Sequence, residues 1–463
     1  MQSEEDGTVI KNITFGNFVG GGKEISSRDN ITLYREEFVT FEKNSSGYTV
    51  SGLTLANPEE AIADVLIPVV DEKDITVEGD VVRAFPFELK KGETQPYFVD
   101  IYIPESFPAG EYQLPYTIHT DKGVITYSLK VKVWDIALSS TQKQGSYFGA
   151  NSSRTMAKIE EAAKNRIFIN AIATSDGTLK ENQEYLYNKY GYNNAAIGYW
   201  SGVDINNTTG IAPNPVPTVD AVSAKLNTFF NKLNLFAYTF DEVTGKTEFY
   251  DDIIDYAKVL HTAGAKQLVT MPPVEELMDD GLGQGRSAVD IWVMLPKQYD
   301  DSKYSETIAS ARAKGDEIWS YNCLSQDRYS PKMLLDYPLL CYRIQPGFIN
   351  YALDMDGFLY WRIDTNYSSE NPWHFAAGKE TFNADGVLFY PSESAGISKS
   401  YLSSVRAKAL RDGFEDYELC YALEQINSVK TDTSKIATSF SDWTKDKQVL
   451  LEERSKLGDL LDN

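Results

Sequence analysis

The alternation of apolar and polar residues changes character near residue 140. Up to about residue 138 every second residue of the short apolar runs is apolar, and these runs are rich in β-branched and aromatic residues. Such alternation is typical of strands that bury one face. Runs at 48–53, 98–103, 112–118 and 124–134 are separated by turn segments, and no helical period of useful length occurs among them. We therefore predict an antiparallel β-sandwich over residues 1–138.

After residue 145 short apolar runs alternate with amphipathic stretches, which is typical of βα units around a parallel sheet. Eight runs are predicted strands: 146–150, 166–173, 195–200, 233–240, 266–271, 288–294, 317–321 and 357–363. The helices expected between or after them cover 152–164, 179–190, 219–232, 247–263, 302–313, 335–353 and 398–426. Eight such units fit a (β/α)8 TIM-like barrel over residues 146–427, with a doubly wound open sheet as the alternative.

Beyond the barrel, apolar residues recur at helical spacing in 434–461, so we expect a terminal helix within a C-terminal helical extension at 428–463. The predicted fold class is therefore multi-domain α/β, a β-sandwich followed by a barrel and C-terminal helices.

The composition and charge restrict the partners. Apolar residues make up 42% and charged residues 24% of the 463 residues, as in soluble globular proteins. With 44 Lys+Arg against 67 Asp+Glu the net charge is −23, which disfavours binding to nucleic acid and to anionic membrane surfaces. No run of about 18 apolar residues occurs, so no membrane insertion is expected.

The residues that hold metals and cofactors are few and scattered. Three cysteines and three histidines lie far apart: Cys323, Cys341, Cys420, His119, His261 and His374. They form neither a disulfide framework nor a zinc pattern. Phosphate-binding, zinc-protease and serine-hydrolase motifs are absent from the sequence, and no metal or cofactor is expected.

One pair of acids stands where chemistry is expected in a barrel. Active sites of such barrels form at the C-terminal ends of the strands. The predicted fourth strand, 233–240, is followed directly by Asp241 and Glu242. At a strand end the chain turns, so both carboxylates can point into the barrel mouth. The alternative is that one of them caps the following helix, whose N-terminal dipole favours acids.

Aromatic and amide residues occupy the other strand ends. Sugar rings pack their C–H faces on flat aromatics and bind amides and carboxylates through their hydroxyls, so this cluster favours a carbohydrate ligand. Any single aromatic could instead belong to the core. The candidate substrate-binding residues are Trp200, Tyr238, Trp292, Tyr321, Asn322, Trp361, Asn366 and Trp373.

Several longer strings stand out in the sequence: Gln95–Pro104, Ala109–Tyr112, Lys314–Cys323, Asp356–Trp361, Asp385–Pro391 and Arg406–Tyr417. Together they resemble glycoside hydrolase family 123 and relatives that share a C-terminal domain of unknown function. The last string is the most specific, because it is similar to the family's R-x-x-A-L-R-D-G-x-E-D-Y signature. The resemblance runs from about residue 60 to residue 425. It implies a retaining β-N-acetylgalactosaminidase built from a β-sandwich and a (β/α)8 barrel.

The resemblance also implies roles for the acid pair. In substrate-assisted hydrolysis the 2-acetamido oxygen of the sugar attacks the anomeric carbon and forms an oxazolinium ion. Asp241 would then hold the acetamido N–H, and Glu242 would act as general acid and base. Val243 stands where relatives often have proline, a departure that bears on the identity of the sugar more than on the chemistry. The segment Arg411–Tyr417 is expected to make ion pairs that dock its helix, because charged runs on helices commonly do so.

Alternatives remain open at this point. The chain could be a non-catalytic glycan-binding surface protein on the same fold, a glycosidase for another sugar, or a structural surface protein. A glycan-degrading enzyme meets its substrate outside the cytoplasm, so we expect an extracytoplasmic location, secreted, periplasmic or surface-anchored. The polar start, Met1–Gly7, fits either a cytoplasmic start or a chain whose export signal has been removed.

Overall fold

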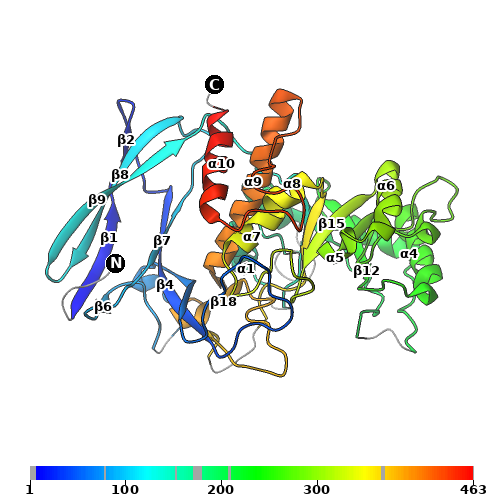
Figure 1. The fold of residues 1–463 in the computed structure, drawn as a ribbon, viewed down its shortest axis with the longest axis horizontal. Helices are drawn as coiled ribbons and strands as arrows, with labels where there is room; N and C mark the ends of the chain where they lie inside the picture. The colour runs from blue at the N-terminus through cyan, green and yellow to red at the C-terminus, as the bar shows by residue number, and fades with distance from the viewer. Residues whose placement is uncertain are drawn as a thin grey trace.

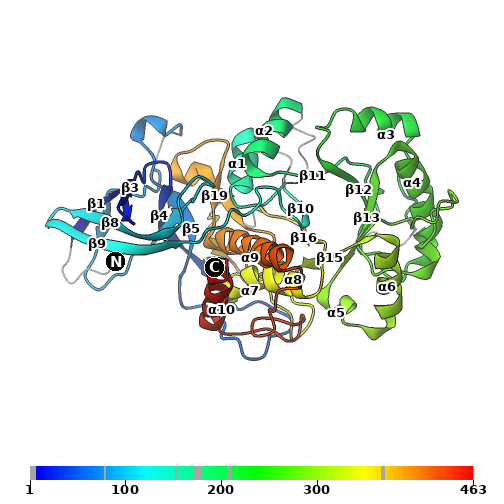
Figure 2. The same cartoon turned by 90° about the horizontal axis from the view of Figure 1, so that it is seen from above.

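The computed structural model describes residues 7–77, 80–151, 154–169, 180–206, 210–365 and 371–461. Antiparallel sheets from the first third of the chain occupy one end of the molecule, and a parallel barrel-like sheet occupies the other (Figure 1). The long helix α9 (Val405–Asn427) lies between them, as the view from above also shows (Figure 2).

The antiparallel part consists of two sheets. The six-stranded sheet has the order β3-β2-β8-β1-β6, with β9 paired to β8. The smaller sheet has the order β17-β4-β5, with β7 also paired to β4; β5 and β7 run antiparallel to β4, and the short β17 runs parallel to it. The strands of the first are β1 (Thr8–Phe15), β2 (Phe18–Gly20), β3 (Lys23–Ile25), β6 (Phe87–Leu89), β8 (Gly110–Thr120) and β9 (Gly123–Val133). Those of the second are β4 (Ile31–Phe41), β5 (Ile62–Pro68), β7 (Tyr97–Ile101) and β17 (His374–Phe375).

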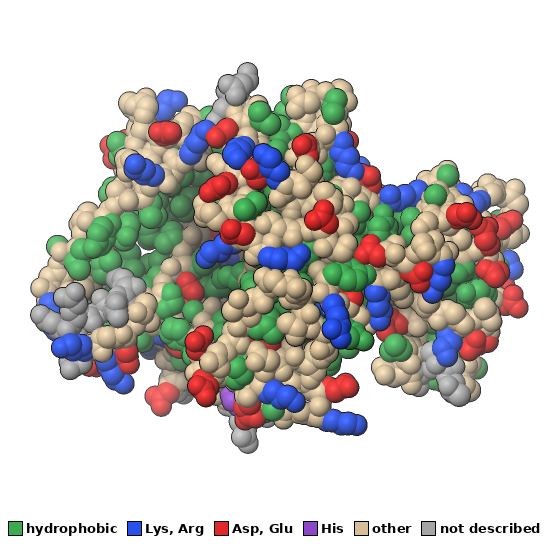
Figure 3. All heavy atoms as spheres, in the orientation of Figure 1, with side chains coloured by type: hydrophobic (Ala, Val, Ile, Leu, Met, Phe, Trp, Pro, Cys, Tyr) green, Lys and Arg blue, Asp and Glu red, His purple; other side chains and the backbone are tan. Residues whose placement is uncertain are grey.

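Alternate residues of both sheets meet in the sandwich core. Ile13 of β1, Ile118 of β8 and Leu33 of β4 are buried in one cluster, as the period-two pattern predicts. In the larger sheet, Ile125 and Tyr127 of the edge strand β9 stay 48% and 56% exposed. Figure 3 shows hydrophobic side chains gathered over this end of the molecule.

The parallel sheet has seven strands among the described residues, in the order β10-β16-β15-β14-β13-β12-β11. They are β10 (Gly145–Phe148), β11 (Asn194–Ala196), β12 (Asn234–Phe240), β13 (Lys266–Val269), β14 (Ile291–Met294), β15 (Glu317–Asn322) and β16 (Gly357–Tyr360). This order is that of a barrel that is open between β10 and β11, where the second predicted strand, 166–173, would fit. The open sheet offered as the alternative is therefore wrong, because β10 and β11 lie at opposite ends of the strand order and yet come together.

Two contacts bridge the opening and nearly close the barrel. The Asn194 side chain on β11 accepts a hydrogen bond from the Ser146 N–H of β10 at 3.1 Å. Ile169, from the predicted strand 166–173, forms a single parallel bridge with Phe148. The rest of that predicted strand, from residue 170, lies outside the described residues, so the eighth strand stays a prediction.

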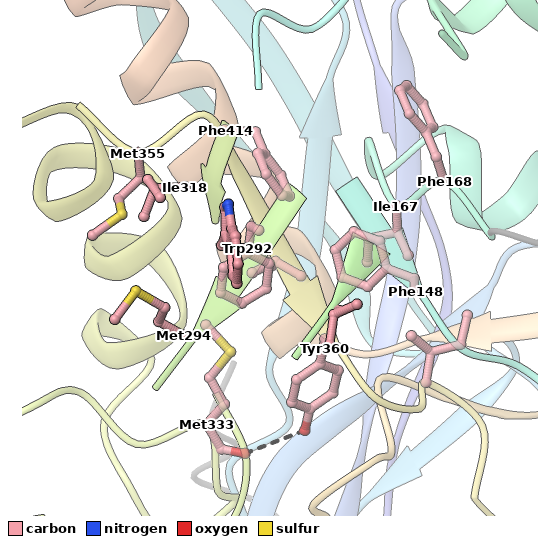
Figure 4. Packing of buried hydrophobic residues seen from close by; sticks show 14 of the residues in the cluster. Phe148, Ile167, Phe168, Trp292, Met294, Ile318, Met333, Met355, Tyr360 and Phe414 are labelled. Atoms are coloured by element: carbon pink, nitrogen blue, oxygen red, sulfur yellow. Dashed lines mark hydrogen bonds between the residues drawn. The ribbon is translucent and has the colours of Figure 1, made fainter. Parts of the chain in front are cut away.

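Two apolar layers surround the strands. The lumen holds Phe236, Leu268, Trp319 and Leu359 together with Tyr321. An ideal Cβ on Gly357 would lie 2.4 Å from the Trp319 ring, so only glycine on β16 leaves room for this indole. The outer layer, between strands and helices, includes Trp292, Phe148, Tyr360 and Phe414 (Figure 4).

The helices largely follow the predicted amphipathic stretches. They are α1 (Met156–Ala163), α2 (Lys180–Tyr190), α3 (Val219–Leu226), α4 (Tyr250–Ala263), α5 (Pro296–Tyr299), α6 (Ser305–Lys314), α7 (Leu340–Ile344), α8 (Asn350–Ala352), α9 and α10 (Lys447–Asp459). Short 3-10 turns cover 72–74, 247–249, 275–277, 302–304 and 392–395, and β18 (Phe389–Pro391) pairs with β19 (Tyr401–Ser403).

Several sequence predictions differ from the structure: the helix predicted over 398–426 begins only at Val405, after strand β19, and two other differences are larger. The continuous helix expected over 335–353 is divided into α7, a π-helical turn at Gln345–Ile349 and α8. Pro346 lies in that turn and has no N–H to donate, so the regular α-helical ladder is interrupted there. The alternating run 48–53 forms no strand; instead the Tyr48 carbonyl accepts a 2.6 Å hydrogen bond from Ser325 Oγ of the barrel part.

Ion pairs dock α9 onto both parts, as expected for the Arg411–Tyr417 segment. Arg411 pairs with Asp100 of β7 at 2.8 Å, and Asp416 pairs with Arg343 of α7 at 2.6 Å. An ideal Cβ on Gly413 would lie 2.4 Å from the Arg343 carbonyl oxygen, so glycine permits this close helix crossing. The predicted terminal helix is α10, where Asp459 accepts a 2.9 Å hydrogen bond from the Trp134 indole.

Across the described ranges, every helix is too short or too polar to cross a bilayer.

Candidate active site

A cavity of about 570 Å³ opens at the C-terminal ends of the parallel strands. This is within the size range of small-molecule sites, roughly 300–1,000 Å³. Its walls are Tyr147, Ala196, Ile197, Gly198, Trp200, Lys225, Tyr238, Asp241, Glu242, Thr270, Tyr321, Cys323, Leu324, Leu359, Trp361 and Asp385. The cavity therefore joins both acids of the predicted pair with four of the predicted substrate-binding residues.

The backbone after β12 sets the directions of the two acids. Glu242 has φ +50°, a conformation that costs about 1–3 kcal/mol for a residue other than glycine. Its N–H donates a 2.6 Å hydrogen bond to Thr270 Oγ1, and the Asp241 N–H donates to the Val203 carbonyl at 3.1 Å. These contacts hold the turn, so two consecutive carboxylates both line the cavity instead of pointing to opposite faces.

The helix-cap alternative is wrong for both acids. The 3-10 turn and α4 that follow begin at Thr247 and Tyr250, and neither has a side-chain cap. Asp241 and Glu242 are thus too far before these helices to cap them.

Asp241 is held by two hydroxyl donors. Tyr238 Oη and Thr270 Oγ1 each donate a 2.6 Å hydrogen bond to Asp241 Oδ1. Among the described residues no hydrogen bond reaches Oδ2, so one carboxylate oxygen is fixed and the other is available to a ligand. Burial raises the pKa of Tyr238 well above its usual value, and the charge on Asp241 adds to the effect, so the phenol remains a donor.

Glu242 has a different environment. Tyr321 Oη donates a 2.6 Å hydrogen bond to Glu242 Oε1 from β15. Burial raises the pKa of Glu242, and the neighbouring charge of Asp241 raises it further, while the Tyr321 hydrogen bond and Lys297 oppose the rise. The net direction is upward, which favours a carboxyl that carries a proton.

Two tryptophans form the apolar walls. Trp200 and Trp361 line the cavity and are 39% and 38% exposed. The Tyr238 ring meets Trp200 edge to face, with ring centroids 5.7 Å apart, and meets Tyr147 in the same way at 5.0 Å. The aromatic walls are therefore packed in place before any ligand arrives.

Three other predicted substrate-binding residues, Trp292, Asn322 and Trp373, lie away from the cavity. Trp292 is 0% exposed in the outer layer, because its neighbours Ile291 and Val293 take the lumen side of β14. Asn322 is buried behind the wall and donates to the Pro331 carbonyl at 2.7 Å. Trp373 packs with the smaller antiparallel sheet. Asn366 lies outside the described residues.

Sequence reasoning missed several cavity residues, of which Asp385 and Thr270 matter most. Thr270 follows β13 directly, so inspection of that strand end for hydroxyls would have found it. Asp385 lies on a loop between β17 and β18, where the strand-end rule does not look; its only signal was the family-like string Asp385–Pro391.

Asp385 is a buried carboxyl in the cavity wall. It is 2% exposed, and Trp361 Nε1 donates a 3.1 Å hydrogen bond to its Oδ2. Tyr360 Oη donates to Oδ1 at 3.3 Å. Burial raises the pKa of Asp385 to about 7, against the lowering effect of these hydrogen bonds.

Among the described residues, the cavity acids are not part of a metal-binding cluster. Within the part of the chain that the structure describes, no three His, Cys, Asp or Glu side chains are grouped to hold an ion. The cavity acids instead take hydroxyl and indole donors.

The second half of the chain matches a known protein family. Residues 266–423 match the family described as glycoside hydrolase 123, catalytic domain. The match includes Thr270, Tyr321, Trp361 and Asp385, and it begins after the acid pair. No curated protein sequence matches the chain.

Among solved structures, a family 123 glycoside hydrolase from Clostridium perfringens, described for glycolipid glycan hydrolysis, is similar with a TM-score of 0.62 and 14% identity. The alignment covers 100% of this chain and 90% of that one, so the two share a fold. A family 39 glycoside hydrolase from Bacteroides cellulosilyticus WH2 gives a TM-score of 0.37 at 11% identity, covering 89% of this chain and 81% of that one, too low to add to the comparison.

Proposed function

We propose that this chain, whose residues 266–423 match the glycoside hydrolase 123 catalytic domain, hydrolyses β-linked N-acetylhexosaminides, preferably N-acetylgalactosaminides, with retention of anomeric configuration. One observation carries the proposal: two adjacent carboxylates line one cavity in unlike environments. Asp241 accepts two 2.6 Å hydrogen bonds at one oxygen, whereas Glu242 accepts one and has a raised pKa. Unlike environments suit unlike roles.

In the first step the acetamido carbonyl oxygen of the substrate attacks the anomeric carbon. The bond from that carbon to the leaving oxygen breaks, and Glu242 donates its proton to this oxygen. The product is an oxazolinium ion, with Glu242 left as a carboxylate. Asp241 Oδ2 accepts the acetamido N–H, and the negative charge of Asp241 stabilises the positive charge that develops on the ring.

In the second step Glu242 acts as a base. It takes a proton from water, and the water oxygen attacks the anomeric carbon while the bond to the acetamido oxygen breaks. Two displacements at the same carbon restore the original configuration. Glu242 ends protonated and ready for the next substrate, so the cycle balances without a cofactor.

Tyr321 and Thr270 support both steps without reacting. Tyr321 Oη donates to Glu242 and therefore stabilises the carboxylate that forms in the first step. Thr270 accepts from the Glu242 N–H and donates to Asp241, so one hydroxyl fixes the relative position of both acids. A preset arrangement of this kind avoids reorganisation during the reaction.

The wall residues support a sugar substrate. Trp200 and Trp361 line the cavity together with the carboxylates, and their partly exposed rings can take the apolar faces of a pyranose. Substrates of this kind are displayed outside the cytoplasm, and we therefore also propose an extracytoplasmic location for the protein. Detection of the protein only in the cytoplasm of its native host would contradict this location.

The experiment is a panel of nitrophenyl β-glycosides of GalNAc, GlcNAc, galactose and glucose, with proton NMR to identify the first anomer released. We expect release from the two acetamido sugars, fastest for GalNAc, with the β-anomer appearing first. A thiazoline mimic of the oxazolinium ion should inhibit. Release from galactose or glucose at similar rates would indicate another glycosidase mechanism, and sugar binding without release at any pH would indicate a binding protein.

A further inference from the structure

We propose that Asp385 recognises the C4 hydroxyl of the sugar and thereby sets the preference between galacto and gluco configurations. The proposal rests on the proposed function, because it takes the anomeric carbon to lie at Glu242. It assigns Asp385 to substrate specificity, apart from the bond-breaking steps.

Sheet order places Asp385 across the cavity from the acid pair. Asp241 and Glu242 follow β12, and Trp361 follows β16, with β13, β14 and β15 between them on one side of the barrel and β11 and β10 on the other. Strands so separated stand on opposite walls of a closed or nearly closed barrel. The 3.1 Å hydrogen bond from Trp361 Nε1 keeps Asp385 on the β16 wall.

Cys323 gives an independent sign that both walls face one compact space. The pKa of its thiol is raised by burial first, then by the charge of Asp385, and further by Glu242 and Asp241. The thiol lines the same cavity. Cys323, Asp385 and the acid pair therefore line one common cavity.

The geometry of a pyranose then assigns the contact. The ring atoms C1 and C4 are diametrically opposite. With C1 at Glu242 and the C2 acetamido group at Asp241, the C4 substituent points to the far wall, where Asp385 lies beside Trp361. A carboxylate is an acceptor, and a C4 hydroxyl is a donor whose direction differs between galacto and gluco sugars.

The loop that carries Asp385 is fixed from outside the barrel. Asn383 donates from Nδ2 to the Lys43 carbonyl at 2.8 Å and from its backbone N–H to Ser45 Oγ at 3.0 Å. On the other side of Asp385, the Gly386 N–H donates to Tyr360 Oη at 2.9 Å. The segment after β4 therefore takes part in building the sugar site, and the carboxylate is positioned before the sugar binds.

A deoxy sugar cannot make the hydrogen bond that its parent sugar makes to a charged group in the transition state. Loss of that bond lowers kcat/KM by about 10- to 100-fold. The same loss follows when the carboxylate is removed. If the two groups contact each other, removing the second after the first has little further effect. This non-additivity separates a direct contact from a structural role of Asp385.

The test measures kcat/KM of wild type, Asp385→Asn and Asp364→Asn on 4-nitrophenyl β-GalNAc and its 4-deoxy analogue. Asp364 is the matched control, because it follows β16 and, like Asp385, accepts side-chain hydrogen bonds, here from Tyr401 Oη at 2.7 Å, but does not line the cavity. We expect a 4-deoxy penalty of about 10- to 100-fold for wild type and Asp364→Asn, and of at most a few-fold for Asp385→Asn. An equal penalty in all three proteins would overturn the inference.

Two further measurements keep the test decisive. If Asp385→Asn does not fold, wild type alone must lose more activity on the 4-deoxy than on the 3-deoxy glycoside; equal losses overturn the assignment. If wild type cleaves no β-hexosaminide, the proposed function fails, and calorimetric binding of GalNAc and 4-deoxy-GalNAc takes the place of kinetics. Equal dissociation constants, or no binding of either sugar, would then overturn the role of Asp385 as well.

Discussion

Tyr321 Oη donates a 2.6 Å hydrogen bond to Glu242 Oε1, joining strand β15 to the turn after β12 across the cavity mouth. This hydrogen bond favours the charged carboxylate and so partly offsets the rise that burial and Asp241 cause in the pKa of Glu242. The hydroxyl is thus placed to set the pH at which the proposed acid loses its proton.

Tyr321→Phe should move the alkaline limb of the pH profile upward. Without the donor, the pKa of Glu242 rises further above its usual value, and activity that needs the protonated acid persists to higher pH. Profiles of kcat/KM against pH measure this shift. Lys297→Met should act in the same direction, because the Lys297 charge also lowers the Glu242 pKa. The control Tyr256→Phe, whose hydroxyl bonds to the Asn214 carbonyl, should leave the limb in place. A downward shift in Tyr321→Phe would contradict the assignment.

Thr270→Val should lower kcat more than it changes KM. Valine preserves the shape but removes the acceptor for the Glu242 N–H and the donor to Asp241, so both acids lose their common anchor. A loss of about 100-fold is expected, the effect of a displacement of roughly 1 Å at reacting groups. Thr270→Ser retains the hydroxyl and should recover most of the rate. If valine and serine variants are equally slow, the hydroxyl is not the anchor.

Asp64→Asn should destabilise the fold without direct effect on the cavity. Asp64 and Arg406 are each 1% exposed and lie 2.9 Å apart, and removing one partner leaves a buried unpaired charge. The loss is about 3–5 kcal/mol of unfolding free energy. Denaturant unfolding followed by tryptophan fluorescence measures it. Asp301→Asn, which removes an exposed pair with Lys303, should change stability little. Similar midpoints for the two variants would refute the prediction.

The sequence predicted the strands well because runs in a parallel sheet are buried on both faces and therefore continuously apolar. Because both faces are buried, the sequence pattern does not show to which face an individual side chain points. Trp292 and Tyr321 both stand in such runs, yet Trp292 faces the helices and Tyr321 faces the lumen. When both faces are buried, apolarity does not tell them apart; only the register of each strand does.

Tertiary contacts account for the other differences. The alternating run 48–53 buries Val50 to 1% exposure against the barrel and so needs no sheet partner. Asp385 reaches the cavity on a loop anchored by Lys43 and Ser45, more than three hundred residues earlier in the chain. Such long-range hydrogen bonds leave no periodic signal. The acid pair, in contrast, directly follows its strand, where barrel geometry predicts functional residues.

The most direct test of the account compares how Glu242→Gln and Asp241→Asn depend on the leaving group. The measurement is kcat/KM on a series of aryl β-N-acetylgalactosaminides whose phenols range from strongly to weakly acidic. Glu242→Gln should lose little on the most acidic phenol and progressively more as protonation of the leaving oxygen becomes necessary. Asp241→Asn should be slowed by a similar factor throughout, because the oxazolinium needs its charge whichever group departs. The same dependence in both variants, or none in either, would contradict the two roles.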